Sequence, residues 1–257
     1  MPSKSIVLQY LTIIQIGSYL LLLTKLFQST LWRKYRYFTF YLVFETIRVP
    51  LMSVIPRKTD AYAITYFSTQ PIIWLLFVLT VLELFQLVLR NHVGIASLGR
   101  KALSISLVLS ALISVSTLVF ELQRQAPESA FLYNFMLLER LVMMSLLVLV
   151  LCLIAFLSYF PVPLTRNVRV HASIFAAFFA VRTTLLFVRT WFGRDVVASL
   201  NVVAYVAMIA CLLAWFRLLT LEGEAAPQKV RPSSDSEARL LAQLDALNET
   251  LLRSARK

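Results

Sequence analysis

Charged side chains lie inside long apolar stretches of this chain, and they are the residues best suited to chemistry. Glu45 and Arg48 are three positions apart, which places them one turn apart on the same face of a helix. Glu139 can pair with Arg182 or with its neighbour Arg140. Because an unpaired charge at the centre of a bilayer costs at least about 2.5–3.5 kcal/mol, we expect these groups to face the protein interior and to pair.

At a helical rise of about 1.5 Å per residue, most of these groups lie roughly 9–15 Å from the predicted outer ends of their helices. One interpretation is a set of polar clasps that join helices. The other is an outward-open pocket with three arginines and two glutamates, whose surplus positive charge suits a small anionic or carboxylate-bearing ligand. The candidate ligand-binding residues are Glu45, Arg48, Asn134, Glu139, Arg140, Arg182 and Asn201.

A second polar site is predicted nearer the inner side, at Glu83 and Gln86. Glu83 could pair with a cytoplasmic arginine such as Arg90, which lies on the same helical face. It could instead carry protons. Pairing is the favoured interpretation, because the sequence places no second intramembrane acid at its level.

Other chemistries find no support in the sequence. Neither His92 nor His171 has Cys or Asp neighbours at metal-ligand spacing. Residues 195–221 contain no lysine, so a retinal Schiff base is excluded. Nucleophile and metalloprotease motifs are also missing. We therefore expect neither a cofactor, nor a metal, nor an enzymatic activity.

The elements that must position these residues are transmembrane helices. The chain is 59% hydrophobic and only 15% charged, whereas ordinary soluble domains are about 45–50% apolar and about 25% charged. A membrane-spanning helix needs about 20 apolar residues. The sequence therefore predicts an all-α polytopic membrane protein with seven transmembrane helices in a domain over 1–221, at roughly 5–27, 35–55, 62–89, 101–122, 130–157, 168–190 and 195–221.

The distribution of Lys and Arg predicts the orientation of this bundle. Sixteen of them fall in the connections after the first, third and fifth helices and in the C-terminal tail, against six on the opposite side. Because positive residues remain in the cytoplasm, the N-terminus is predicted outside and the C-terminus inside. The net charge of +12 thus indicates membrane topology and no nucleic-acid partner.

The C-terminal tail has a pattern of its own. Residues 222–233 have the composition of a flexible linker, and residues 234–257 begin with a Ser-x-x-Glu capping box. A two-heptad seam follows. It favours either a coiled coil, joining two protomers or a partner protein, or an amphipathic helix on the inner leaflet or the bundle. The seam residues are Leu240, Leu244, Leu247 and Leu251.

Several short segments resemble a group of bacterial seven-helix membrane proteins of uncharacterised activity that are common in acidobacterial genomes. The resemblance covers about residues 5–220, and it implies a fold and a cell-membrane location without an activity. Its motifs are Tyr35-Arg36-Tyr37-Phe38, Tyr41-Leu42-Val43-Phe44-Glu45-Thr46-Ile47-Arg48, Val81-Leu82-Glu83-Leu84-Phe85, Gly99-Arg100-Lys101 and Asn201-Val202-Val203-Ala204-Tyr205.

Taken together, these patterns favour a multi-pass protein of the bacterial inner membrane with the lipid bilayer as its surroundings. We expect a receptor-like sensor that binds a small, anionic ligand in its outer half and signals through the cytoplasmic tail. A small transporter or channel and a structural subunit of a membrane complex are the alternatives. A transport path would need polar residues from the outer layer to the inner face, where only Glu83 and Gln86 are available.

Overall fold

The computed structural model describes residues 2–56, 59–89, 108, 112, 130–159, 165–192 and 197–225. The fourth predicted helix at 101–122 and the predicted tail helix at 234–257 lie outside this part, except for two isolated residues of the former. The described residues are all-α.

Helices form wherever the sequence offers a long apolar run, because a backbone in lipid must satisfy its hydrogen bonds internally. The expected helices other than the fourth are confirmed, with ends that differ by a few residues. The elements are α1 (Pro2–Gln28), the 3₁₀ turn η1 (Leu31–Arg33), α2 (Arg36–Val54), α3 (Asp60–Leu89), α5 (Ala130–Tyr159), α6 (Arg166–Phe192), α7 (Val197–Leu218) and the short α8 (Glu222–Ala225).

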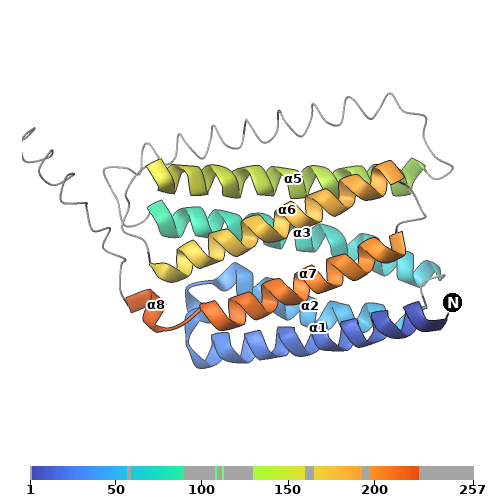
Figure 1. Ribbon diagram of the computed structural model, residues 1–257, viewed down its shortest axis with the longest axis horizontal. Helices are drawn as coiled ribbons and strands as arrows, with labels where there is room; N and C mark the ends of the chain where they lie inside the picture. Colours follow the sequence, from blue (N-terminus) through green and yellow to red (C-terminus); the bar gives the residue numbers. More distant parts are fainter. Residues whose placement is uncertain are drawn as a thin grey trace, which may run out of the picture.

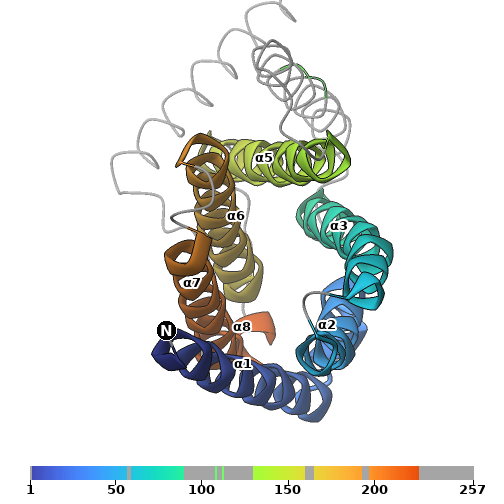
Figure 2. The same cartoon turned by 90° about the vertical axis from the view of Figure 1, so that its right-hand side faces the viewer.

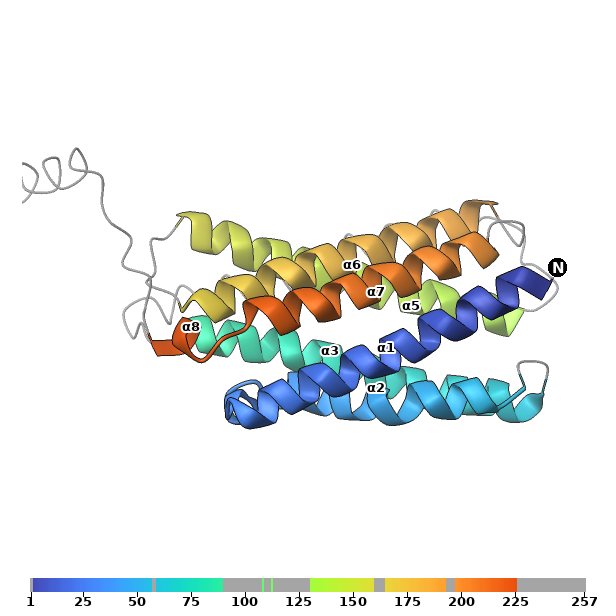
Figure 3. The same cartoon turned by 60° about the horizontal axis from the view of Figure 1, so that its bottom comes forward.

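The six long helices that the structure describes form a closed ring. Each one contacts the next in the order α1, α2, α3, α5, α6 and α7, and α7 returns to α1. Figure 2 looks along the helices and shows this ring around a common axis. Helices α1, α3, α5 and α7 begin at the end of the bundle that carries the N-terminus, while α2 and α6 begin at the opposite end, where α8 also lies (Figures 1 and 3).

The outside of the ring is apolar. Large hydrophobic side chains such as Ile13, Ile47, Ile64 and Leu75 are exposed, which is unfavourable in water and favourable against lipid tails. Five of the described helices, namely α1, α3, α5, α6 and α7, are long and apolar enough to cross a membrane. The protein is therefore a multi-pass membrane protein by length and composition.

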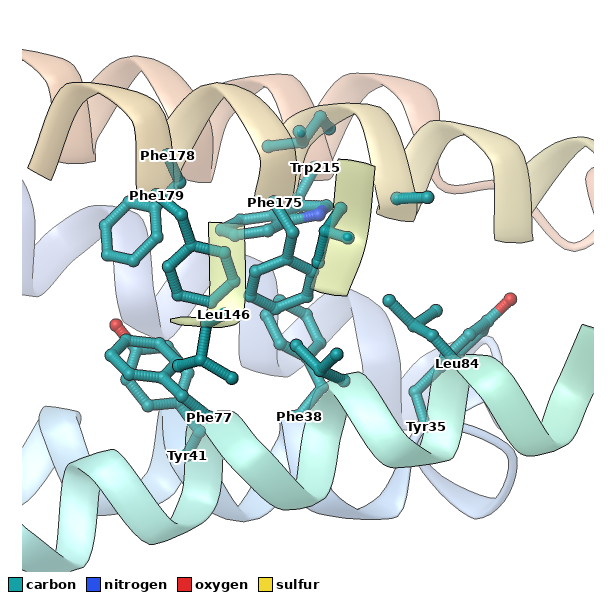
Figure 4. Packing of buried hydrophobic residues seen from close by; sticks show 14 of the residues in the cluster. Tyr35, Phe38, Tyr41, Phe77, Leu84, Leu146, Phe175, Phe178, Phe179 and Trp215 are labelled. Carbon is teal, nitrogen blue, oxygen red and sulfur yellow. The ribbon is translucent and has the colours of Figure 1, made fainter. Parts of the chain in front are cut away.

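The axis of the ring is filled by aromatic side chains in the half nearer α8. We call this group the aromatic plug (Figure 4). Phe38 lies 4.8 Å from Trp215 between ring centroids, and Tyr41 lies 4.6 Å from Phe77. Tilted and edge-on contacts of this kind stabilise aromatic pairs beyond their burial. The plug comprises Phe38, Tyr41, Phe77, Phe175, Phe178, Phe179 and Trp215.

The first residues of the predicted linker at 222–233 are helical. Residues Glu222–Ala225 form the single turn α8, which contacts α6. This segment has the composition of a linker, but hydrogen bonds from other parts of the chain hold it in place. Such tertiary bonds cannot be inferred from composition alone. The rest of the predicted linker lies outside the described residues.

Candidate functional site

A cavity of about 550 Å³ occupies the axis of the ring in the half away from the aromatic plug. It is lined mainly by the first halves of α1, α3, α5 and α7 and the second halves of α2 and α6, so it lies toward the N-terminal end of the bundle. Three residues of the plug also line it and form its floor, namely Tyr41, Phe77 and Phe178. Each long helix contributes at least one polar residue: Gln15, Glu45, Gln70, Glu139, Arg182 and Asn201.

The first polar feature of the cavity wall is an ion pair between Glu45 and Arg48. The Arg48 Nη1 atom donates to Glu45 Oε1 at 3.1 Å, as the three-residue spacing predicted. The same guanidinium reaches α3, where Nε donates to Thr69 Oγ1 at 3.0 Å and Nη2 donates to Gln70 Oε1 at 2.8 Å. Arg48 therefore clasps α2 to α3.

The second feature is an ion pair between Glu139 of α5 and Arg182 of α6. The Arg182 Nη2 atom donates to Glu139 Oε1 at 3.0 Å. Of the two arginines proposed from the sequence, Arg182 is therefore the partner that the structure pairs with Glu139. Tyr66 adds a bond from its hydroxyl to Glu139 Oε2 at 3.3 Å.

Gln70 connects the two ion pairs. Its Oε1 atom accepts from Arg48, and its Nε2 atom donates to Glu139 Oε1 at 3.3 Å. The result is a continuous polar chain through α2, α3, α5 and α6. In a low-dielectric interior such a chain is strongly favoured over its separated members, so it both joins the helices and lines the cavity.

Three further polar side chains extend the wall onto α1. The hydroxyls of Tyr19 and Tyr41 lie 3.4 Å apart, and Gln15 Nε2 donates to the Tyr19 hydroxyl at 3.4 Å. All three side chains are buried and line the cavity. The candidate residues predicted from the sequence did not include this group or Gln70. The signal that could have found Gln15 and Gln70 is that each is an amide within an otherwise apolar helix.

The structure places only some of the predicted residues in the cavity. Glu45, Arg48, Glu139, Arg182 and Asn201 line it together.

Asn134 and Arg140 are not among the lining residues. Asn134 is exposed, and Arg140 is buried with its guanidinium 4.4 Å from the centre of the Phe187 ring. The reason is the helical angle. Adjacent residues leave a helix about 100° apart, so Arg140 cannot share the direction of Glu139, and Asn134, five positions earlier, cannot share it either.

At the opposite end of the ring, Glu83 meets the start of α2. Its Oε1 atom accepts the backbone N–H of Arg36 at 2.9 Å, and the N–H groups of Tyr37 and Phe38 also contact the carboxylate. The first N–H groups of a helix have no partner within the helix and attract a negative charge. Glu83 therefore caps α2, whereas Gln86 is exposed and lies apart from it.

Glu224 of α8 is the second polar feature at that end. Its carboxylate accepts hydrogen bonds from the Lys34 ammonium, from the Tyr35 hydroxyl and from Asn167 Nδ2, the last at 3.0 Å. Burial and the adjacent carboxylate raise the pKa of Tyr35 far above its usual value, so its hydroxyl keeps the proton that it donates. Asn167 also bonds the Thr220 carbonyl at 2.7 Å. Glu224 thus ties the base of the tail to α6 and to the connection before α2.

The predicted seam residues Leu240, Leu244, Leu247 and Leu251 lie outside the described residues. Comparison with known proteins found no matching family model, no matching curated protein and no matching solved structure.

Proposed function

We propose that this chain is a seven-helix protein of a bacterial inner membrane, with its N-terminus outside and its C-terminus in the cytoplasm. The excess of Lys and Arg at the α8 end supports this orientation. The directions of α3 and α5 support an additional crossing. The end of α3 and the start of α5 lie at opposite ends of the bundle, as the seven-helix proposal requires.

Within this topology, the protein acts as a receptor-like sensor of a small carboxylate-bearing ligand. The observation that carries the proposal is the 550 Å³ cavity lined by Arg48, Arg182 and Arg189. Among the described residues, the cavity wall contains two carboxylates, Glu45 and Glu139, against these three cations, which leaves one surplus positive charge. Arginine binds carboxylates through two parallel hydrogen bonds, and such bonds are strong where water is excluded.

The signal is proposed to pass along the helices to the tail. The lining residues Arg182 and Asn201 lie on α6 and α7. Asn167 lies at the other end of α6, and Thr220 follows the last residue of α7 by two positions. Both of these residues hold the segment that ends in Glu224. A ligand that shifts α6 relative to α7 would therefore change how firmly the base of the tail is held, and no enzymatic step is needed.

A transporter is the less favoured proposal, because the aromatic plug fills the axis beneath the cavity. A structural subunit remains the alternative in which the ion pairs serve only to join helices. A sensor and a structural subunit differ in ligand binding, because ion pairs that only join helices need no ligand.

The experiment is a thermal-shift measurement on the full chain in lipid nanodiscs. We expect short carboxylates such as succinate and L-aspartate, tested at millimolar concentration, to raise the unfolding midpoint. The Arg182→Gln variant should lose this rise. Arg140→Gln is the matched control, because it removes a buried arginine of the same bundle that does not line the cavity.

Two results would contradict the proposal. One is the absence of any shift with the carboxylates in the parent protein. The other is an equal loss of the shift in Arg182→Gln and Arg140→Gln, which would show that the effect does not depend on the cavity.

A further inference from the structure

The cavity presents unused hydrogen-bond donors on Arg182. One of its Nη2 hydrogens is given to Glu139, and no described residue accepts from Nη1. Nε is buried without a partner among the described residues, so the donors open to the cavity are those of the two Nη atoms. The side chain is 35% exposed although it lies within the ring, because it faces the cavity. A guanidinium with this much free donor capacity is suited to hold a carboxylate in bidentate fashion.

The two glutamates of the cavity are not equivalent. Glu139 accepts from Arg182 and Gln70 through Oε1 and from Tyr66 through Oε2, so both of its oxygens are engaged. Glu45 accepts from Arg48 through Oε1, and among the described residues no donor contacts its Oε2. Among the described residues, the cavity therefore holds an open carboxylate oxygen on Glu45 as well as the open guanidinium of Arg182.

Further acceptors belong to residues that line the same cavity. Gln15 lines the cavity, and its buried Oε1 atom has no hydrogen-bond partner among the described residues. The paired hydroxyls of Tyr19 and Tyr41 lie within electrostatic range of Glu45. An ammonium group has three hydrogens to donate and is also attracted to the faces of tyrosine rings. A carboxylate, an amide oxygen and tyrosines form the set of groups that such a cation requires.

We propose that the cavity recognises a zwitterionic amino acid, with its carboxylate on Arg182 and its ammonium on Glu45, Gln15 and the Tyr19–Tyr41 pair. This inference rests on the proposed function and names its ligand class. The surplus charge of Arg189, for which the described residues provide no carboxylate partner, favours an acidic side chain over a basic one.

The test compares L-aspartate with succinate, which is the same molecule without the ammonium group. Binding to the full chain in nanodiscs is measured by isothermal titration calorimetry. We expect L-aspartate to bind at least tenfold more tightly than succinate, and L-lysine to bind more weakly than L-aspartate. Glu45→Gln should reduce the preference for L-aspartate over succinate to less than threefold, and Gln15→Leu should reduce it in part. Glu222→Gln, on the exposed surface at the other end, should leave it unchanged.

The outcomes separate this inference from the proposed function. Equal affinity for L-aspartate and succinate in the parent protein would overturn the zwitterion and leave a carboxylate sensor. An aspartate preference that survives both Glu45→Gln and Gln15→Leu would also overturn it, because the ammonium would then lie elsewhere. Failure of every carboxylate and amino acid to bind would remove both proposals. Size-exclusion chromatography confirms that each variant is folded, and Gln15→Leu retains the test if Glu45→Gln does not fold.

Discussion

Gln70 of α3 donates its side-chain amide to Glu139 of α5 at 3.3 Å, and this bond closes the polar chain between two ion pairs. The same amide accepts from Arg48 through its oxygen, and the residue is only 3% exposed. Gln70 therefore uses both ends of its amide in the interior of the bundle. A residue that serves two charged partners at once is expected to contribute more to stability than an ordinary polar side chain.

The first prediction concerns Gln70→Leu. The substitution leaves Arg48 and Glu139 each without one hydrogen bond, and we expect a loss of about 1–2 kcal/mol in the free energy of unfolding. The measurement is the thermal or denaturant-induced unfolding of the full chain in detergent. Gln86→Leu is the control, because Gln86 is an exposed glutamine on the same helix. Equal losses in the two variants would show that the polar chain adds nothing to stability.

The second prediction concerns the pair Glu139 and Arg182. Removing one partner leaves a buried charge uncompensated, so Arg182→Gln is expected to cost about 3–5 kcal/mol, whereas Glu139→Gln with Arg182→Gln should cost less than the sum of the single variants. A double-mutant cycle on unfolding free energies measures the coupling. A coupling near zero would mean that the two side chains act independently.

The described helices and one of the ion pairs follow from the sequence because they depend on local rules. Apolar length sets the helices, and the spacing of Glu45 and Arg48 places both on one face. The partner of Glu139 remained ambiguous, since two arginines were within reach and only the packing of α5 on α6 decides between them.

Other parts of the site depend on tertiary geometry that no local rule provides. Gln15 and Gln70 line the cavity because α1 and α3 are rotated so that these positions face the axis of the ring. Asn134 had a suitable residue type and depth, but its helical angle points it away from the axis. Glu224 lies in a segment with the composition of a linker, and its role depends on Tyr35 and Asn167, which are far from it in sequence.

The third prediction compares two glycines. A methyl group at Gly223 would overlap the Oδ1 atom of Asn167, so Gly223→Ala is expected to lower the unfolding midpoint by displacing that side chain. Gly17→Ala is the matched control. Nothing lies within 4 Å of its added carbon, and alanine is more stable than glycine in a helix interior by roughly 0.5–1 kcal/mol. The midpoint should therefore rise for Gly17→Ala. The same direction of change in both variants would contradict the described packing around Asn167.

The fourth prediction concerns the orientation in the membrane. Single cysteines are introduced at Ser53, exposed at the cavity end, and at Glu222, exposed at the α8 end, after Cys152 and Cys211 are replaced by alanine. A membrane-impermeant maleimide added to intact bacterial cells should label the cysteine of Ser53→Cys. It should label that of Glu222→Cys only after the cells are permeabilised. The reverse pattern would invert the proposed topology.

The last prediction concerns the attachment of α8. Glu224→Gln removes the charge that attracts Lys34 and weakens the acceptor for Tyr35 and Asn167, so we expect the segment after α7 to detach more often. Limited trypsin digestion of the protein in nanodiscs reports this detachment as faster cleavage after the exposed Arg217. Glu222→Gln is the control, because it removes an exposed charge from the same turn. If signalling passes through this contact, a saturating carboxylate should change the cleavage rate in the parent protein and not in Glu224→Gln. An unchanged cleavage rate in the parent protein with ligand bound would show that ligand binding in the cavity does not affect the tail. The contact of α8 would then have a purely structural role.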